Sequence, residues 1–387
     1  MLMAKRPVAQ FVMKISKYCN LRCTYCYEFN ELGNKQRMSP ELISRIFENI
    51  ASHVVPNEYE WVSFVWHGGE PFLIPLEYYE SIGRLQQEIF GEKVAVWNVV
   101  QTNLTVMTPR HLEFLKSQKF FRAIGISFDV LGDQRVDTQG RRKDDVVLEN
   151  MQKLIDHEIP FGAIAVLARN TLPHVKPIYQ FYDQLQIGSR FLPFYMDASN
   201  DQIARHAVTY DEQVDALKTI FGEWLASDNA TPVDPIGDYV DYAIAHISKR
   251  PAKHYRREAD EFVFMVGLDG SVWGQGEAYE PEYQYGNLAQ DGFGQILSSQ
   301  GRRRSVEEAQ SRTERLCRQC PYYGACPGFF VADSSPQQKR MFEESGCPVR
   351  DVVGHIVRTL ETTGVAERIT SRAAILEKNP STQLVPF

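Results

Sequence analysis

The sequence has no run of apolar residues long enough to cross a bilayer. Its first ten residues lack the apolar core and the small-residue cleavage site of a secretory signal. Basic residues are not in excess either, since 42 Lys and Arg stand against 49 Asp and Glu. The net charge of -7 gives no reason to expect a nucleic-acid or acidic-membrane partner. We therefore expect a cytoplasmic protein with reduced thiols and no membrane partner.

Cysteine is missing from the 290 residues between Cys26 and Cys317. The cysteines instead form two groups, one near each end of the chain, and these are Cys19, Cys23, Cys26, Cys317, Cys320, Cys326 and Cys347. An odd total of seven argues against a disulfide framework, and scattered core cysteines would not segregate in this way. Three thiols and four thiols predict two metal sites.

Apolar, β-rich segments alternate with helical patterns over the first two hundred residues. The expected strands are residues 11–16, 62–66, 94–101, 123–128, 160–168 and 190–195, and the expected helices include 40–54, 109–118, 145–157 and 174–185. This alternation is typical of parallel βα units, so it predicts an α/β barrel or an open sheet. Polar and Gly-containing motifs follow the strands, where such folds place their active sites.

The pattern changes after residue 200. We expect helices over 210–227 and 234–249, a hairpin over 261–273, a Cys-, Gly- and Pro-rich region that is loop-like, and a closing helix over 349–365. The predicted domains are an α/β barrel (1–200), a helical connector (201–258), a small Cys-rich α+β domain (259–350) and a C-terminal helix and tail (351–387).

The first motif is Cys19-x3-Cys23-x2-Cys26-Tyr27, directly after a strand. Three neighbouring thiolates can hold three irons of a cubane cluster and leave the fourth iron open. An open metal position is what chemistry at a metal requires. The alternatives are three unrelated thiols or a zinc knuckle, although the next histidine, His53, lies beyond a helical segment.

At these residues the sequence resembles the radical S-adenosylmethionine superfamily. The resemblance implies a partial (βα)6 TIM-like barrel and a [4Fe–4S] cluster on Cys19, Cys23 and Cys26, whose open iron binds S-adenosylmethionine. Reduction by a flavodoxin- or ferredoxin-type donor would cleave the cofactor to methionine and a 5′-deoxyadenosyl radical, which abstracts a substrate hydrogen. The radical chemistry belongs to the cofactor, and the protein positions and shields it.

Contacts to S-adenosylmethionine follow from the same resemblance. Gly68-Gly69-Glu70-Pro71, after the second strand, is similar to the family's methionine-binding turn, although alone it would be an ordinary tight turn. Further expected contacts lie at the ends of later strands or beside the cysteines, and these are Tyr27, Asn103, Ser127, Arg135 and Leu192. Helix caps or solvated loops are the alternatives for these side chains, and Arg141 and Arg142 compete with Arg135 for the cofactor carboxylate.

The second cysteine group, Cys317-x2-Cys320-x5-Cys326 with Cys347, forms a closed four-thiolate site that suits either zinc or [4Fe–4S]. This region resembles the SPASM domain, the auxiliary-cluster extension of peptide-modifying radical enzymes, including anaerobic sulfatase maturases. The full domain needs further cysteines, and the corresponding places here hold Gln275, Gly276 and Phe330. We therefore expect a shortened, twitch-like domain with one auxiliary [4Fe–4S] cluster on Cys317, Cys320, Cys326 and Cys347.

The resemblance also places a catalytic base near Glu277, with Asp129, Asp197 and Glu280 as competitors and a solvated loop glutamate as the alternative. The predicted function is maturation of a ribosomally made precursor peptide by oxidative, cyclophane-type side-chain crosslinking. Formylglycine generation on a sulfatase and dehydrogenation or epimerisation of a small metabolite stay as alternatives. A pure electron carrier is disfavoured, because it would need neither a barrel nor an open-iron cysteine triplet.

Overall fold

The computed structural model describes residues 6–117, 119–194, 205–229 and 231–363. Within them one sheet contains ten strands in the order β10-β9-β8-β1-β2-β3-β4-β5-β6-β7. The strands are β1 (Val8–Lys14), β2 (Trp61–His67), β3 (Ala95–Thr102), β4 (Phe121–Ser127), β5 (Gly162–Leu167), β6 (Ser189–Pro193), β7 (Val233–Asp234), β8 (Val263–Val266), β9 (Ser271–Gly274) and β10 (Gly286–Asn287).

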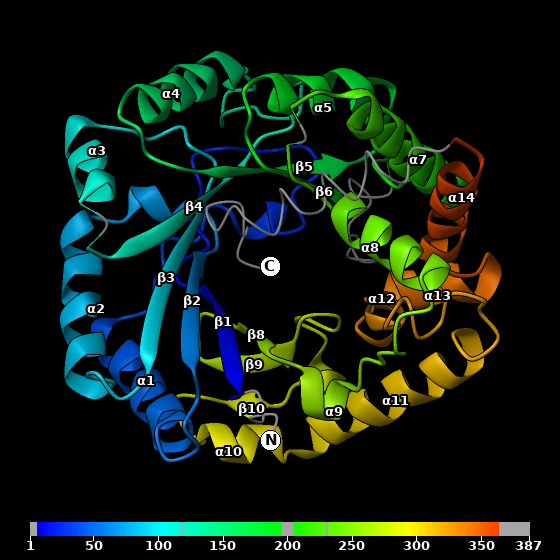
Figure 1. The fold of residues 1–387 in the computed structure, drawn as a ribbon. Coiled ribbons are helices and arrows are strands. Elements are labelled where there is room, and N and C mark those ends of the chain that lie inside the picture. The colour runs from blue at the N-terminus through cyan, green and yellow to red at the C-terminus, as the bar shows by residue number, and fades with distance from the viewer. Residues whose placement is uncertain (1–5, 118, 195–204, 230, 364–387) are drawn as a thin grey trace.

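Neighbouring strands from β1 to β7 are all parallel, as the βα alternation predicts. Helices follow the strands and lie along the outer side of the curved sheet (Figure 1). They are α1 (Pro40–Val54), α2 (Leu76–Ile89), α3 (Pro109–Lys116), α4 (Asp144–Asp156), α5 (Val175–Gln184), α7 (Tyr210–Ala226) and α8 (Ile236–Ile247), with short 3-10 turns η1 (Phe29–Glu31), η2 (Pro71–Leu73) and η3 (Leu172–His174). The prediction of a partial (βα)6 TIM-like barrel is confirmed.

Alternation along each strand separates an outer core from the inner side of the barrel. In β1, Ala9, Phe11 and Met13 pack with the helices in the main core. The intervening Val12 belongs instead to a small cluster with valines of β2, β3 and β8. Strands that are covered on both faces read as continuous apolar runs, which is why these segments stand out in the sequence.

The Cys-rich part extends the barrel sheet instead of forming a separate layer. Strand β8 pairs in parallel with β1, and β9 and β10 continue the sheet in antiparallel fashion. Further helices complete the ring from α10, which lies beside α1, to α14, which packs on α7 and α8 (Figure 1). They are α9 (Arg257–Asp260), α10 (Phe293–Leu297), α11 (Gln300–Leu316), α12 (Phe329–Ala332), α13 (Pro336–Glu344) and α14 (Pro348–Thr363), with the 3-10 turn η4 (Pro281–Tyr283).

The expectation of a loop-like region after the hairpin is wrong for residues 300–316, which form the 17-residue helix α11. Its composition is so polar that no apolar stripe marks it, and it buries the side chains of Arg302 and Arg312 instead. The Ser299 side chain, which accepts a hydrogen bond from Arg302 N–H, was the available signal. Tyr195, Asp197 and Val365, to which the sequence analysis assigned elements or roles, lie outside the described residues.

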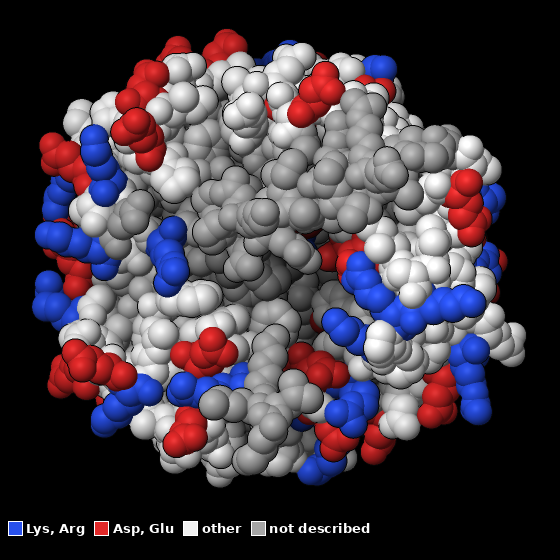
Figure 2. Space-filling model, viewed as in Figure 1, with Lys and Arg blue, Asp and Glu red and all other residues white. Residues whose placement is uncertain are grey.

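The surface carries charges of both signs. Lys and Arg side chains are interspersed with Asp and Glu around the rim of the face in Figure 2. No helix among the residues described here has the length and apolarity needed to cross a membrane.

Candidate active site

Four loops that follow parallel strands meet at one edge of the barrel, because the carboxyl ends of parallel strands share an edge. The loop after β1 carries Cys19, Cys23 and Cys26, which pack together with Leu21 and Leu32. Burial raises the pKa of Cys19 and of Cys26 to about 12. The metal-free thiols are therefore protonated at neutral pH, and iron must displace these protons to bind.

The turn after β2 needs two glycines because it packs directly against the backbone of the segment that leads into the cysteine loop. Gly68 and Gly69 have positive φ of 93° and 35°. A Cβ at Gly68 would lie 2.3 Å from the carbonyl oxygen of Ser16, and one at Gly69 would lie 2.1 Å from that of Tyr18. No side chain fits at either position, so this turn holds the chain directly before Cys19 in place.

Glu70 is buried, and its carboxylate accepts three hydrogen bonds from the protein. One oxygen accepts hydrogen bonds from Phe72 N–H at 2.8 Å and from the Thr102 hydroxyl at 2.7 Å. The other accepts from Asn103 N–H at 2.6 Å. Burial raises the pKa of Glu70 to about 7, although these hydrogen bonds oppose the shift. The carboxylate thus joins the ends of β2 and β3, a role that the sequence analysis did not foresee.

Asn103 lies beside the cysteine loop. Its side-chain amide nitrogen is 3.6 Å from Cys19 Sγ and 3.1 Å from the side-chain oxygen of Asn20. An N–H group directed at a cluster sulfur stabilises its negative charge and tunes the cluster. The structure thus brings Asn103 next to the cysteine loop, and its contact with S-adenosylmethionine stays a prediction.

Asp129 and Arg135 lie behind Cys23 and share one partner, Tyr25. The Tyr25 hydroxyl donates to Asp129 Oδ2 at 2.6 Å, and Arg135 donates to the Tyr25 oxygen at 2.7 Å. Arg135 also approaches Asp129 at 3.2 Å and Cys23 Sγ at 3.9 Å. Sequence reasoning missed Tyr25, although its place between two cluster cysteines was a signal. Asp129 is 2% exposed and accepts Val166 N–H as well, which favours an anchoring role over that of a free base.

The inner side of the barrel holds a cavity of about 190 Å³, which we call the lumen cavity. Two predicted cofactor contacts, Tyr27 and Leu192, line it, and Ser127 accepts a hydrogen bond at 2.7 Å from a third lining residue, Gln101. The other Gln101 side-chain atom, Oε1, is buried without a partner among the described residues. An acceptor left unpaired at a cavity is costly unless a ligand donor reaches it.

A buried lysine stands at the cysteine end of this cavity. Lys14 lies at the end of β1, and its ammonium contacts the Tyr27 hydroxyl and Glu28 at 2.8 Å. Burial alone would lower the pKa of Lys14, but Glu28 and Tyr279 outweigh it and raise the pKa overall. Burial, together with the charge of Lys14, holds the pKa of His67 well below its usual value. Lys14 is therefore charged and His67 neutral, and sequence reasoning missed both.

The C-terminal cysteines line a second cavity of about 80 Å³, which we call the cysteine cavity. Burial raises the pKa of Cys317 and Cys326 to about 12 and that of Cys347 to about 11. A zinc ion with Zn–S bonds of about 2.3 Å would need thiols converged on one point. Nowhere in the described ranges do three His, Cys, Asp or Glu side chains converge closely enough to hold a single metal ion.

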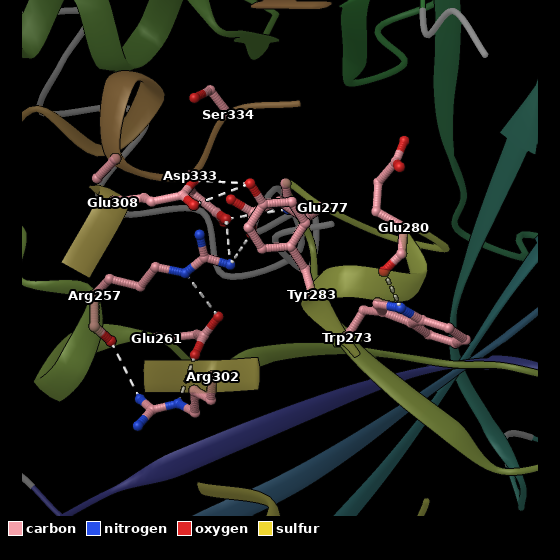
Figure 3. Close-up of polar contacts among 12 residues, drawn as sticks. Arg257, Glu261, Trp273, Glu277, Glu280, Tyr283, Arg302, Glu308, Asp333 and Ser334 are labelled. Atoms are coloured by element: carbon pink, nitrogen blue, oxygen red, sulfur yellow. Dashed lines mark hydrogen bonds and ion pairs between the residues drawn. The ribbon is translucent and has the colours of Figure 1, made fainter. Parts of the chain in front are cut away.

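Glu277 does not line the lumen cavity. Figure 3 shows it inside a buried ion-pair network, where its oxygens lie 2.7 Å from Arg257 and 2.9 Å from Lys339. Burial acts to raise the pKa of Glu277, but Arg257 and Lys339 outweigh it and lower the pKa overall. Its competitor Glu280 lies to the right of the network in Figure 3, and its carboxylate points away from it. The geometry favours an ion-pairing role for Glu277 over that of a catalytic base.

Residues 13–182 match the family model of the Radical SAM superfamily, so this part of the chain is a radical SAM domain. The chain is homologous to anaerobic sulfatase-maturating enzymes. It is 22% identical over 330 residues to the cysteine-type enzyme of Clostridium novyi (strain NT), which covers 83% of this chain and 87% of that protein. It is 24% identical over 355 residues to the serine-type enzyme of Bacteroides thetaiotaomicron, with coverages of 84% and 82%.

Among solved structures, native anSMEcpe with bound AdoMet and the Cp18Cys peptide matches with a TM-score of 0.67 and 19% identity. The match covers 90% of this chain and 99% of that one, and at this identity it shows the fold. The match of residues 13–182 to the Radical SAM superfamily implies that this domain uses S-adenosylmethionine and a [4Fe–4S] cluster. The Cys-rich C-terminal region is consistent with an auxiliary cluster.

The residues present fit these groups. Cys19 is buried, and Cys23 and Cys26 beside it are half-buried in the same loop, which a glycine turn braces. The Gln101 oxygen at the lumen cavity has no partner among the described residues and could accept a hydrogen bond from a ligand. When bound, S-adenosylmethionine supplies a 5′-deoxyadenosyl radical that removes a hydrogen atom from the substrate. The chain's own part is to hold the cluster sulfurs, to direct Asn103 and Arg135 at two of them, and to keep the site within a walled lumen.

Proposed function

We propose that this enzyme oxidises a peptide by joining side chains, with an aromatic ring carbon bonded to the β-carbon of a nearby residue, in a ribosomally made precursor. Support comes from the extent of the similarity to the sulfatase-maturating enzymes, which continues over 82–87% of their length. It therefore includes the Cys-rich part as well as the barrel. The names of those relatives state that they mature a sulfatase, which is a protein substrate.

The observation that carries the proposal is that the Cys-rich part forms one wall of the lumen cavity. Gln275, Ala278 and Tyr279 line this cavity together with barrel residues. The Tyr279 ring stacks on that of Tyr27, with centroids 6.4 Å apart and planes at 24°. A substrate that reaches the lumen therefore meets both parts of the chain at once, as an extended peptide can.

The proposed reaction removes two hydrogens. One leaves as a hydrogen atom to the 5′-deoxyadenosyl radical, and the other leaves as a proton and an electron when the new carbon–carbon bond restores the aromatic ring. The electron acceptor would be the auxiliary iron–sulfur cluster on Cys317, Cys320, Cys326 and Cys347. In the N-terminal site we assign the cluster to Cys19, Cys23 and Cys26, and the cofactor contacts to Tyr27, Gly68, Gly69, Glu70, Asn103, Ser127, Arg135 and Leu192.

Formylglycine generation is the second candidate, because the curated relatives are sulfatase-maturating enzymes. The two products differ in chemistry. Formylglycine contains an aldehyde, which reacts with hydroxylamine, whereas a carbon–carbon crosslink does not. Fragmentation separates them as well, since a crosslink suppresses cleavage between the joined residues.

The test is the intact mass of the short peptide encoded beside the gene, after co-expression with the enzyme under low oxygen. We expect a loss of two hydrogens that disappears with Cys23→Ser and a product that does not react with hydroxylamine. A hydroxylamine adduct would support the formylglycine reading. An unchanged mass, together with no deuterium uptake from D₂O, would contradict peptide oxidation and favour a small-molecule substrate.

A further inference from the structure

A third cavity, of about 290 Å³, adjoins both the lumen cavity and the cysteine cavity, and we call it the bridging cavity. It shares Leu192 and Gln275 with the lumen cavity. It shares Cys326, Phe330 and Val349 with the cysteine cavity. A substrate side chain in the bridging cavity would therefore lie between the lumen and the cysteines of the auxiliary site.

The proposed crosslinking needs a proton acceptor in this part of the molecule, because a ring carbon loses a proton when the ring becomes aromatic again. Glu277 is held in ion pairs, and Asp129 anchors the cysteine loop. The lumen cavity has no Asp or Glu among its described lining residues. Its neutral histidine, His67, accepts the Gly68 N–H on Nδ1, so the other ring nitrogen carries the proton and is a donor. The base must therefore come from elsewhere.

Asp333 places a carboxylate on the wall of the bridging cavity. It directly follows the short helix α12, and its side chain is 4% exposed. Oδ1 accepts the Gly276 N–H at 3.1 Å and lies 3.5 Å from a nitrogen of Arg257. Oδ2 makes no hydrogen bond or ion pair with any described residue. One oxygen of Asp333 is thus anchored, and the other is free to take a proton.

The glycine at position 276 makes room for this carboxylate. A Cβ on Gly276 would lie 2.9 Å from Asp333 Oδ1 and equally close to the Asp333 backbone. The Asp333 side chain therefore occupies the space that a side chain at position 276 would need. Sequence reasoning searched for the base in the turn that contains Gly276 and Glu277, and the fold brings a carboxylate there from 57 residues further along the chain.

Neighbouring charges leave Asp333 and Glu277 in different states. An Arg257 nitrogen lies 2.7 Å from Glu277 but 3.5 Å from Asp333. Burial raises the pKa of Asp333 to about 6, and Glu261 and Glu277 act in the same direction against Arg257. The pKa of Glu277 is lowered instead. A base works best with a pKa near the working pH, because it is then largely ionised and still binds a proton readily. Asp333 meets this condition and Glu277 does not.

Asp238 is a second carboxylate on the same wall, so it competes with Asp333 for the role. Asp238 is exposed to solvent, whereas the Asp333 side chain is almost entirely covered. A shielded acceptor takes the proton without admitting water to the substrate radical. The geometry therefore favours Asp333.

We propose that Asp333 is the base of the crosslinking reaction, an assignment that rests on the proposed function. Once the β-carbon radical has bonded to the aromatic ring, the ring is a radical that keeps one saturated C–H carbon. The proton of that C–H bond passes to Asp333 Oδ2, and the two bonding electrons enter the ring. One electron then leaves to the oxidised auxiliary iron–sulfur cluster, and the ring is aromatic again. Asp333 returns its proton to water.

The test measures peptide oxidation by the reconstituted holoenzyme under anaerobic conditions, divided by the 5′-deoxyadenosine formed in the same reaction. This ratio corrects for a variant that binds less cluster. Asp333→Asn keeps an acceptor oxygen for the Gly276 N–H but cannot take the proton, so we expect the ratio to fall about 100-fold. Asp145→Asn is the matched control, because Asp145 is exposed on α4 at the outer side of the barrel, and its ratio should equal that of the wild type.

A second variant separates a proton acceptor from a structural charge. In Asp333→Ala, formate can enter the space left by the carboxylate and take the proton, whereas chloride can replace only the negative charge. We expect formate to restore part of the lost ratio, and chloride at the same ionic strength to restore none. Both reactions use one protein preparation, so the comparison does not depend on how well the variant folds.

The outcomes separate the assignment from the proposed function. A wild-type ratio in Asp333→Asn, or equal recovery of Asp333→Ala with formate and with chloride, would overturn the assignment. So would a loss in Asp238→Asn that is absent from Asp333→Asn. In each of these cases the wild type still oxidises the peptide, so the proposed function stands. If the wild type oxidises no peptide, the proposed function fails and the assignment fails with it.

Discussion

Replacement of Glu277 by glutamine distinguishes a structural carboxylate from a catalytic base. The side chain is fully buried, and its network contains four cations and four carboxylates among the described residues, which are Arg257, Arg302, Arg312, Lys339, Glu261, Glu277, Glu308 and Asp333. Glu277→Gln keeps the shape and removes one negative charge. It leaves two close cations, at 2.7 and 2.9 Å, without their principal partner.

The expected cost follows from this geometry. Breaking a buried ion pair by removing one partner costs about 3–5 kcal/mol. Arg257 keeps Glu261 at 3.1 Å, and Lys339 keeps Glu308 at 3.6 Å, so the lower end of that range applies. At roughly 2.1 cal/mol/K per residue, the unfolding entropy of 387 residues is roughly 0.8 kcal/mol/K. A loss of about 3 kcal/mol in the free energy of unfolding therefore lowers Tm by about 4 °C.

The assay is thermal unfolding of anaerobic, reconstituted protein at matched iron content, because bound clusters themselves raise Tm. Glu280→Gln is the matched control, since its carboxylate points away from the network, and we expect its Tm to change by less than about 1 °C. Glu277→Gln combined with Lys339→Met should recover part of the loss, since these two residues pair directly. An unchanged Tm in Glu277→Gln, with peptide oxidation abolished while 5′-deoxyadenosine still forms, would refute the structural reading and establish a base.

Three further predictions concern the cysteine sites and Asp238. In Gly69→Ala a Cβ would collide with the Tyr18 carbonyl, so we expect the variant to lose the N-terminal cluster and all 5′-deoxyadenosine formation. Its iron content should fall to that of the auxiliary cluster alone. Iron analysis that shows both clusters intact would contradict this. Cys320→Ser should lower iron content but preserve cofactor cleavage without peptide, and a complete loss of cleavage would show that the auxiliary site is needed for the first step. Asp238→Asn should raise Tm at pH 8 by about 1 °C at most and lose this advantage towards pH 4. A folded-state pKa of about 6, above the usual 3.8, makes the ionised carboxylate destabilising once the pH rises through it, but the side chain is exposed and solvent screens the effect; a Tm difference independent of pH would contradict the shift.

The parallel barrel could be predicted from the sequence because its strands are buried on both faces and its helices carry local start signals. Helix α1 occupies the predicted residues, with Ser39 as its cap. Helix α11 could not be recognised by an apolar stripe, since it is stabilised by buried arginines whose partners, such as Glu261, lie 41 residues away in the chain. Pairings at that distance leave no periodic pattern in the sequence.

The candidate site shows the same division. The cysteine spacing and the glycine turn are local, so the sequence alone placed the cluster loop. The hydrogen bonds that Glu70 accepts from Thr102 and Asn103 form only because the ends of β2 and β3 meet at one edge of the sheet. The cavity lined by Tyr239 and Phe329 depends on α8 and α12, two helices far apart in sequence that meet in the fold. Such a site becomes visible only once the chain is folded.

The central claim is that the lumen directs a 5′-deoxyadenosyl radical at a peptide. The most direct measurement follows deuterium from a peptide labelled at the β-carbons into 5′-deoxyadenosine, in anaerobic reactions with the reconstituted enzyme. We expect one deuterium in 5′-deoxyadenosine for each peptide that loses two hydrogens, and none with Cys23→Ser. Formation of unlabelled 5′-deoxyadenosine beside an unmodified peptide would contradict it.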